Sequence, residues 1–324
     1  MHAPPSNPVR LPTCRDRASW RLRSRTLELS QRTLLMGIVN ITPDSFSDGG
    51  SFFTPDTAIA HALGLLDDGA DILDLGAEST RPGSRAGGTP ATPEAPAVSA
   101  EEEQARLLPV LEGVLRARPS AVLSVDTYKA ATARAALAAG VEIVNDVSGF
   151  QWDPEMASIC GASRCGVVLT HTRGRPEEWA SQPALASDGV LSTVRAGLAA
   201  SMGAATHAGI DAEAMVLDPG YGFGKRFDEN YALLARQHEL LDLGRPLLAG
   251  LSRKSFLGRT LAPLFAGKDA PPDARETASV AALVAAILHG ASIVRVHNVR
   301  AAAEAARIAD AILVAESHLP PSQT

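Results

Sequence analysis

The sequence predicts an α/β fold and, within that class, a single-domain (β/α)8 TIM barrel. About eight short apolar runs each end at a polar residue or a glycine, and eight parallel strands close such a barrel. Stretches of helical character separate the runs, as a parallel sheet requires. An open, doubly wound sheet is the alternative, but no GxGxxG motif follows the first run, so we prefer the barrel. The runs cover residues 36–40, 72–76, 122–126, 143–146, 167–171, 215–218, 247–250 and 293–297.

Capping residues mark the ends of the intervening helices. Thr54 suits an N-cap position and Pro55 the first helical position, with apolar residues following at helical spacing. Ser99 suits a second N-cap, because the glutamates at 101–103 would lie at the positive end of the helix dipole. Further helices are predicted at 129–139, 190–207, 228–237, 274–289 and 299–316.

The composition is that of one soluble globular domain. The chain has 324 residues, of which 45% are hydrophobic and 20% charged, and its net charge is −6. No apolar run is long enough to span a membrane and the N-terminus lacks a signal-peptide core, so we expect a cytoplasmic protein without a membrane partner. Three cysteines argue against a disulfide framework. We expect an N-terminal extension at 1–30, the barrel at 31–318 and a disordered tail at 319–324.

The N-terminal extension is proline-rich and then arginine-rich. A basic arm can bind nucleic acid, but the net charge is negative and nothing downstream extends the basic patch, so we expect no nucleic acid partner. The alternating pattern of residues 20–29 instead predicts a strand or hairpin at the bottom of the barrel. A second irregular segment, 84–98, is rich in Gly, Pro, Ala and Thr and predicts a surface loop.

Polar residues at the carboxyl ends of the strands would converge on one face of the barrel. Asp126, Asn145 and Asp218 have short side chains suited to hydrogen bonding with the edge of a flat heterocycle. A group of cationic residues implies an anion at the rim, held by local pairing because the protein as a whole is acidic. These cationic residues are Arg81, Arg253, Lys254, Arg295 and His297. The pattern predicts a ligand with a hydrogen-bonding ring and a phosphate.

Seven sequence blocks together resemble the signature of the dihydropteroate synthase family, the folate-pathway enzymes that sulfonamides target. They occur in the family's order and extend from about the first barrel strand to the last. The blocks are MGIVNITPDSFSDGG (36–50), GAESTRPG (76–83), SVDT (124–127), VNDVSG (144–149), DPGYGFGK (218–225), SRKSFLG (252–258) and RVHN (295–298).

The resemblance implies a transferase that condenses 6-hydroxymethyl-7,8-dihydropterin diphosphate with 4-aminobenzoate, forming 7,8-dihydropteroate and releasing pyrophosphate. It also implies a homodimer and a Mg²⁺ cofactor. By similarity, Asn40 would bind the Mg²⁺, and Arg295 and His297 would contact the phosphate oxygens. The residues implied around the pterin ring are Asp126, Asn145, Asp218 and Lys254.

By the same resemblance, 4-aminobenzoate would pack against residues of the strand-end loops. Phe46, Thr80, Pro82 and Phe223 would contact its ring, and Ser252 its carboxylate. Phe46 and Phe223 could instead be ordinary loop anchors.

Several of these residues have a structural alternative. Asp126 could cap the following helix, and only one of the neighbours Asn145 and Asp146 need face the ligand. Motif alignment favours Asn145. His171 also ends a strand, but we expect a hydrogen-bonded structural histidine and not a base.

The chain departs from the family pattern in three places. Asn298 stands where Asp is usual, Thr172 and Arg175 stand where Met and Thr are commoner, and segment 84–98 is longer than the usual link. Two alternative functions are a methyltetrahydrofolate-binding methyltransferase barrel and a catalytically silent paralogue that acts as a binding protein. The first should lack the STRPG and DSFSDGG loops, and the intact chemistry blocks argue against the second.

Overall fold

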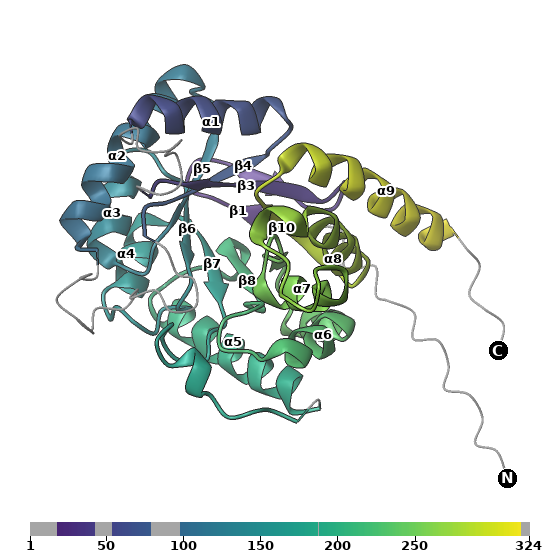
Figure 1. Cartoon of the computed structure of the whole chain (residues 1–324). Helices are drawn as coiled ribbons and strands as arrows, with labels where there is room; N and C mark the ends of the chain where they lie inside the picture. Colours follow the sequence, from purple (N-terminus) through teal and green to yellow (C-terminus); the bar gives the residue numbers. More distant parts are fainter. Residues whose placement is uncertain (1–17, 43–53, 79–97, 187, 319–324) are drawn as a thin grey trace, which may run out of the picture.

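The protein folds as a closed barrel of parallel strands surrounded by helices (Figure 1). The computed structural model describes residues 18–42, 54–78, 98–186 and 188–318. The barrel closes where the last strand pairs with the first, with Ile293 opposite Leu34. Its strands are β3 (Leu34–Asn40), β4 (Ile72–Gly76), β5 (Val122–Asp126), β6 (Ile143–Asp146), β7 (Gly166–Thr170), β8 (Met215–Asp218), β9 (Leu247–Ala249) and β10 (Ala291–Val296). The predicted (β/α)8 barrel is confirmed and the open sheet is wrong.

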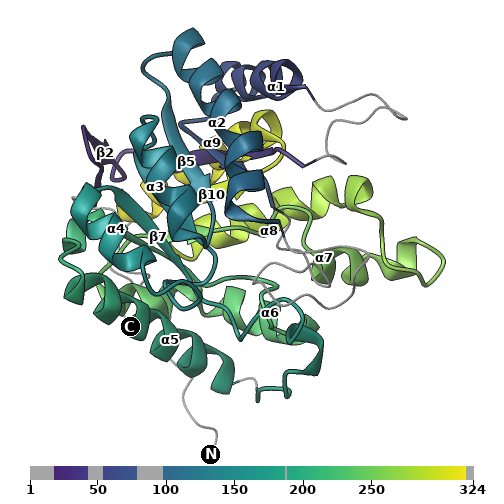
Figure 2. The ribbon, with the colours of Figure 1, turned by 90° about the vertical axis from the view of Figure 1, so that its left-hand side faces the viewer.

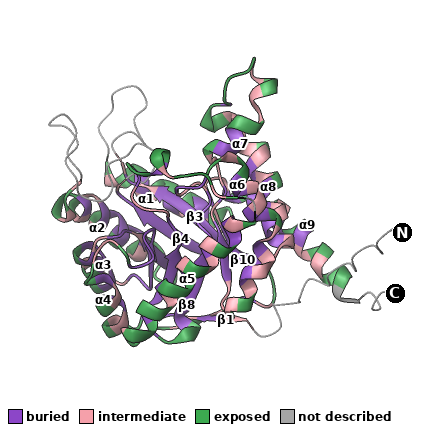
Figure 3. Ribbon diagram, turned by 90° about the horizontal axis from the view of Figure 1, so that it is seen from below, coloured by how far each residue is buried: buried purple, intermediate pink, exposed green. Residues whose placement is uncertain are grey.

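Helices form the outer layer of the molecule, wrapped around the strands (Figure 2). Seen from below, the strands are buried and the helices turn their exposed residues outward (Figure 3). The helices are α1 (Pro55–Asp67), α2 (Ala100–Ala117), α3 (Ala130–Ala138), α4 (Met156–Ser163), α5 (Gly189–His207), α6 (Phe227–Ala235), α7 (Ser255–Thr260), α8 (Glu276–Leu288) and α9 (Val299–His318). Among the described residues, no helix is both long and apolar enough to span a bilayer.

Two of the predicted helix starts differ in how they are capped. Ser99 caps α2 as predicted, because its Oγ accepts a hydrogen bond from the backbone N–H of Glu102 at 3.1 Å. Thr54 occupies the N-cap position of α1, but its side chain makes no capping hydrogen bond. The first turn of α1 therefore relies on Pro55, whose fixed φ suits the helix.

A short antiparallel hairpin precedes the barrel. It consists of β1 (Ser19–Arg21) and β2 (Thr26–Glu28), and the chain reverses where the N–H of Leu22 donates to the carbonyl of Arg25. Of the two predicted arrangements for residues 20–29, the hairpin is correct. Trp20 is fully buried at the bottom of the barrel, where it packs with apolar strand residues such as Met36, and its Nε1 donates to the Ala214 carbonyl at 2.9 Å.

The arginines of this hairpin attach it to the barrel. Arg21 forms an ion pair with Asp211, and Arg23 donates to the Leu137 carbonyl at the end of α3 at 2.7 Å. Arg25 contacts the buried carboxylate of Glu142 at 2.8 Å. These contacts give Arg21, Arg23 and Arg25 partners within the folded chain.

We expect Glu142→Gln to lower the free energy of unfolding by about 1–2 kcal/mol. The Glu142 carboxylate accepts hydrogen bonds from the backbone N–H and the hydroxyl of Ser24 at 3.0 and 2.9 Å, in addition to the Arg25 ion pair. Urea denaturation measures the loss. Glu28→Gln, at an exposed position of the same hairpin, is the control and should stay within about 0.5 kcal/mol of the parent. Equal losses in the two variants would contradict the anchoring role of Glu142.

Candidate active site

The alternation of side chains along the strands builds the site in layers inside the barrel. The lowest layer is apolar and packs with Trp20; it consists of Met36, Ile72, Val122, Ile143, Val168, Val216, Leu248 and Ile293. The residues two positions further along each strand form a layer that is mostly polar: Ile38, Asp74, Ser124, Asn145, Thr170, Asp218, Gly250 and Arg295. Asn145, Asp218 and Arg295 lie in this second layer, and Asn40 and Asp126 each lie two positions further along their strands, so the strand register brings these predicted site residues together.

An arginine and two carboxylates form the centre of this layer. Arg295 donates from Nε to Asp74 Oδ2 and from Nη2 to Asp126 Oδ2, both at 2.6 Å. Asn145 donates from Nδ2 to the same Asp74 oxygen at 2.9 Å. Asp74 is fully buried and the Asp126 side chain is 18% exposed. The arrangement fixes Arg295 and Asn145 relative to each other before any ligand arrives.

Burial and charge set the protonation of this group. Burial raises the pKa of Asp126 to about 7, against the opposing effect of the Arg295 charge. Burial would lower the pKa of Arg295, but the carboxylates of Asp74 and Asp126 raise it above its ordinary value. Arg295 therefore stays a cation, while Asp126 can gain or lose a proton near neutral pH.

Asp218, at the end of β8, and Lys254, shortly after the neighbouring strand β9, form a second pair of opposite charges. Asp218 is 6% exposed, and its Oδ1 accepts a hydrogen bond from the Gly220 N–H at 2.8 Å. Burial raises the pKa of Asp218 and lowers that of Lys254 to about 8, while each group's charge favours the charged form of the other. The Lys254 Nζ lies 3.9 Å from the centre of the Phe223 ring, a cation–π contact.

The structure shows which of the alternative roles predicted for residues at the ends of β5, β6 and β7 are correct. Asp126 does not cap the following helix, because Lys129 is the N-cap residue of α3 and Asp126 pairs with Arg295. Asn145 faces the interior, whereas Asp146 accepts hydrogen bonds from the N–H groups of Ser148 and Phe150 in a tight turn.

His171 has the expected structural role. The expectation that its side chain is hydrogen-bonded is wrong for Nδ1. Nδ1 is buried and has no partner among the described residues. Burial, together with the charges of Lys225 and Arg173, lowers the pKa of His171 to about 2. The ring is therefore neutral at physiological pH and is not a candidate general base that cycles through imidazolium.

At the end of β10, His297 is supported by the predicted aminobenzoate residue Ser252. The Ser252 Oγ lies 2.9 Å from His297 Nδ1. Asn298, which departs from the family pattern, accepts a hydrogen bond from the Ala301 N–H at 3.1 Å and so caps the start of α9. Asparagine and aspartate are equally good caps, so this substitution leaves the loop intact. Arg253 and His297 line a small cavity of about 300 Å³ beside α1.

The aromatic side of the mouth shows how the chain accommodates its unusual residues on the β7 loop. Phe223 packs against Trp179 with ring centres 5.0 Å apart, and the Trp179 Nε1 donates to the Thr172 hydroxyl at 3.1 Å. Thr172 and Trp179 are both buried. Arg175 lies over the Trp152 ring at 5.3 Å. Phe223 is thus both a loop anchor and a wall of the mouth.

Three predicted aminobenzoate contacts and one predicted cation of the rim, Arg81, lie outside the described part of the chain, and so does nearly all of segment 84–98. The three aminobenzoate contacts are Phe46, Thr80 and Pro82. Asn40 is described: it is the last residue of β3 and lies opposite Gly76 of β4 at the mouth.

Asp74 is the site residue that the sequence analysis missed. It lies in the middle of β4, whereas the residues predicted to converge on the site stand at or near strand ends. A carboxylate inside the apolar run ILDLG was the available signal, because charged residues are almost never fully buried unless they are paired.

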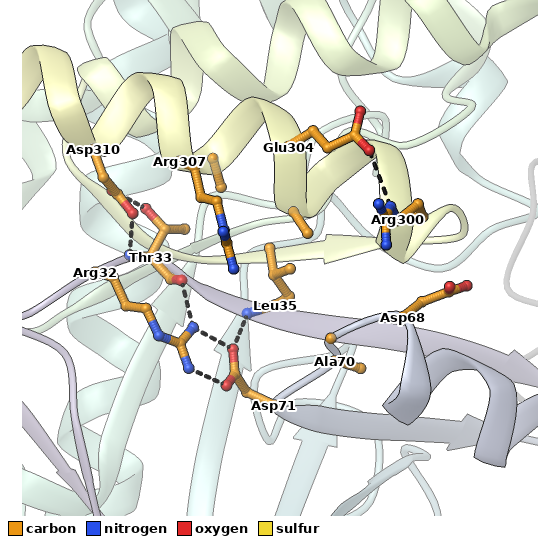
Figure 4. Close-up of a pocket in the computed structure, with 13 residues that line it drawn as sticks. Arg32, Thr33, Leu35, Asp68, Ala70, Asp71, Arg300, Glu304, Arg307 and Asp310 are labelled. Carbon is orange, nitrogen blue, oxygen red and sulfur yellow. Dashed lines mark hydrogen bonds and ion pairs between the residues drawn. The ribbon is translucent and has the colours of Figure 1, made fainter.

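A larger cavity, of about 490 Å³, lies away from this site, between the α1–β4 turn and α9 (Figure 4). Its charged residues pair largely among themselves: Arg32 with Asp71, and Arg300 with Glu304. Arg32, Arg300 and Glu304 are more than half exposed. The buried, convergent polar groups are at the barrel mouth, which is therefore the candidate active site.

The fold and the mouth together define a pterin-binding barrel enzyme, and comparison with known proteins agrees. A family model described as pterin binding enzyme matches residues 36–297. The chain is 39% identical over 287 residues to the dihydropteroate synthase of Bacillus subtilis, covering 89% of this chain and 91% of that protein. It is 43% identical over 282 residues to that of Mycobacterium leprae, covering 86% and 93%.

Solved structures give the same result. A Yersinia pestis dihydropteroate synthase in complex with a sulfonamide drug superposes with a TM-score of 0.80 at 38% identity, covering 92% of this chain and 99% of that one. The Xanthomonas albilineans enzyme in complex with 7,8-dihydropteroate gives 0.75 at 37% identity, covering 93% and 100%. The chain belongs to the dihydropteroate synthase family.

Proposed function

We propose that the chain condenses 6-hydroxymethyl-7,8-dihydropterin diphosphate with 4-aminobenzoate to form 7,8-dihydropteroate and pyrophosphate. The observation that carries this proposal is the set of convergent polar groups at the barrel mouth, in which Asn145 and Asp218 are buried and Asp126, Lys254 and Arg295 are half-buried. Family membership and the relatives' complexes with sulfonamide and 7,8-dihydropteroate support the same reaction.

The pterin ring would be held by complementary donors and acceptors. An ionised Asp218 can accept from the ring N–H and the exocyclic amine together, and Lys254 can donate to the ring carbonyl and N5. Asp126 and Asn145 would make further hydrogen bonds to the edge of the ring. A ring without these donors would leave the buried Asp218 unpaired, which gives the site its selectivity.

The diphosphate would lie above the ring, near Arg295 and His297. Arg295 uses one N–H each from Nε and Nη2 for its two carboxylates, so three of its five donors remain for phosphate oxygens. Because these contacts strengthen as charge develops on the leaving group, they favour ionisation of the C–O bond.

A Mg²⁺ ion at Asn40 fits the donors at this position. The described residues contain no cluster of three or more His, Cys, Asp or Glu that could hold a metal. Mg²⁺ does not need one, because it keeps several waters and is commonly held by one or two protein oxygens together with substrate phosphates. The half-buried Asn40 amide would supply a protein oxygen, and the ion would neutralise charge on the departing diphosphate.

The reaction then needs little acid–base help. The C–O bond to the diphosphate breaks, the methylene carbon bonds to the amine nitrogen of 4-aminobenzoate, and that nitrogen loses a proton. The arylamine is already neutral at pH 7, so no activated Ser, Cys or His is required. Phe223 would contact the aminobenzoate ring and Ser252 its carboxylate, and the family resemblance adds Phe46, Thr80 and Pro82 to the ring contacts and Arg81 to the cations that bind the anion.

A coupled assay of pyrophosphate release tests the proposal. With both substrates present, release should be dependent on 4-aminobenzoate and blocked by a sulfonamide. A protein that binds pterin but releases no pyrophosphate would be the silent paralogue. Methyl transfer from methyltetrahydrofolate in the same preparation would identify the methyltransferase instead.

We also propose that the protein is a cytoplasmic homodimer, as the family resemblance implies. The exposed apolar side chains of Ile308, Ile312 and Val314 on α9 support this, because a subunit interface would bury such residues. Light scattering after size-exclusion chromatography would report a monomer mass if the proposal is wrong.

We expect His297→Ala to weaken binding of the diphosphate substrate roughly tenfold while sparing a pterin that lacks phosphate. The lost contacts are to oxygens that the smaller ligand does not have. Calorimetry with both ligands measures the difference, and His207→Ala, at the exposed end of α5, is the control. Equal weakening of both ligands would contradict a phosphate-specific role.

A further inference from the structure

Lys225 is a buried cation to which the proposed chemistry assigns no role. It ends the block DPGYGFGK and is 7% exposed. Its Nζ donates to three backbone carbonyls: that of Gly220 at 2.7 Å, that of His171 at 3.2 Å and that of Phe223 at 3.4 Å. Three acceptors match the three N–H bonds of an ammonium group, so the geometry fits the charged form.

These contacts fix the loop that follows β8. Gly220 has φ +69°, and a Cβ there would lie 1.9 Å from the His171 carbonyl oxygen, so the loop backbone lies directly against the end of β7. The same Gly220 donates its N–H to Asp218 Oδ1 at 2.8 Å. Lys225 therefore binds the carbonyl of Gly220, the residue whose N–H orients the Asp218 carboxylate. It also binds the carbonyl of Phe223, whose ring makes the cation–π contact with Lys254.

The charge of Lys225 acts on Asp218 as well. Burial raises the pKa of Asp218, and the positive charges of Lys254, Lys225 and Arg295 oppose this rise. Burial lowers the pKa of Lys225 to about 7; Asp218 and Glu229 raise it, while Lys254 and Arg173 lower it further. The neighbouring His171 ring is neutral and adds no charge.

We propose that Lys225 is a positioning residue that orients Asp218 through Gly220 and keeps it ionised for pterin recognition. This inference rests on the proposed function, because it assumes that Asp218 accepts hydrogen bonds from the pterin. It concerns affinity for the ring and is separate from the phosphate contacts.

The test compares Lys225→Met with Lys225→Arg by calorimetry, using a pterin without phosphate between pH 5 and 8. We expect the Met variant to bind about 10- to 100-fold more weakly at pH 7. Its acid limb, where binding falls as Asp218 is protonated, should move to higher pH because a neutral side chain no longer favours the carboxylate. The Arg variant keeps the charge, so its acid limb should stay where the parent's is. Asp126 also titrates near pH 7 in all variants, so the shift between variants is the readout.

Glu142→Gln controls for general loss of stability, because it weakens the ion pair between Arg25 and the buried Glu142 carboxylate at the opposite end of the barrel. Its acid limb should match the parent's. An unmoved acid limb in Lys225→Met, or an equal shift in Glu142→Gln, would overturn the inference. If the Met variant does not fold, Lys225→Gln takes its place. The inference would also be overturned if both neutral variants failed to fold and the Lys225→Arg variant folded with a shifted acid limb. A parent that binds pterin but does not turn over would refute the proposed function and leave this inference standing.

Discussion

Replacing Asp218 with asparagine should weaken pterin binding by about 2–4 kcal/mol without unfolding the protein. Asp218 is 6% exposed, and one of its oxygens already accepts the Gly220 N–H, so the carboxylate is fixed in orientation. An amide in its place sets a donor against the donors of the pterin and leaves buried groups unpaired. It also removes the negative charge facing Lys254, whose pKa should fall further because Asp218 at present raises it.

Calorimetry with a pterin lacking phosphate measures this effect directly. Asp211→Asn is the matched control, since Asp211 is an exposed aspartate that pairs with Arg21 at the bottom of the barrel. Thermal unfolding checks that the Asp218 variant is folded. A folded variant with parental pterin affinity would remove Asp218 from the ring-binding site.

The barrel strands were predictable because the residues of each strand also mark where that strand ends. The predicted runs 72–76, 122–126, 143–146 and 215–218 coincide with β4, β5, β6 and β8. In a closed parallel sheet the strands are buried on both faces, so an apolar run followed by a polar residue marks the strand and its carboxyl end together.

The elements that escaped prediction lack such signals. Helix α4 has eight residues, too few for a helical period to stand out. The turn of the hairpin passes through residues 22–25, LRSR, which contain neither glycine nor proline. Its position depends on tertiary contacts, chiefly those of Arg25 and Ser24 with Glu142, which lies more than 100 residues away.

The same distinction explains what could be foreseen of the site. Asp126, Asn145, Asp218 and Arg295 lie at or near strand ends, and the barrel register collects them. Which of them pair in the free protein depends on side-chain geometry across the barrel. The sequence predicted Arg295 as a phosphate ligand alone, and the structure adds its two carboxylate partners.

These partners change the expected result of removing Arg295. Arg295→Met should lower the free energy of unfolding by about 3–5 kcal/mol, because it leaves the carboxylates of Asp74 and Asp126 buried without a counter-charge. Binding of pterin with and without phosphate should both fall, in contrast to His297→Ala, because Asn145 shares the Asp74 oxygen with Arg295. Urea denaturation and calorimetry measure the two effects.

The pH dependence of this loss of stability tests whether the unpaired carboxylates cause it. Burial raises the folded-state pKa of Asp126 to about 7, compared with about 3.9 in an unfolded chain. A carboxyl group whose pKa is raised by folding contributes stability that is complete below the unfolded pKa and is lost as the pH rises through the folded pKa. The Arg295 charge lowers the pKa of Asp126, so its removal extends this loss to higher pH. The stability gap between the parent and Arg295→Met should therefore be largest near pH 8 and shrink toward pH 5.

A triple variant separates unpaired charge from lost packing. Adding Asp74→Asn and Asp126→Asn to Arg295→Met removes both buried charges, so most of the lost stability should return and its pH dependence should disappear, although pterin binding stays weak. If the triple variant is as unstable as Arg295→Met at pH 8, the guanidinium contributes mainly by filling space. The ion pairs with Asp74 and Asp126 would then not be what holds the mouth of the barrel in shape.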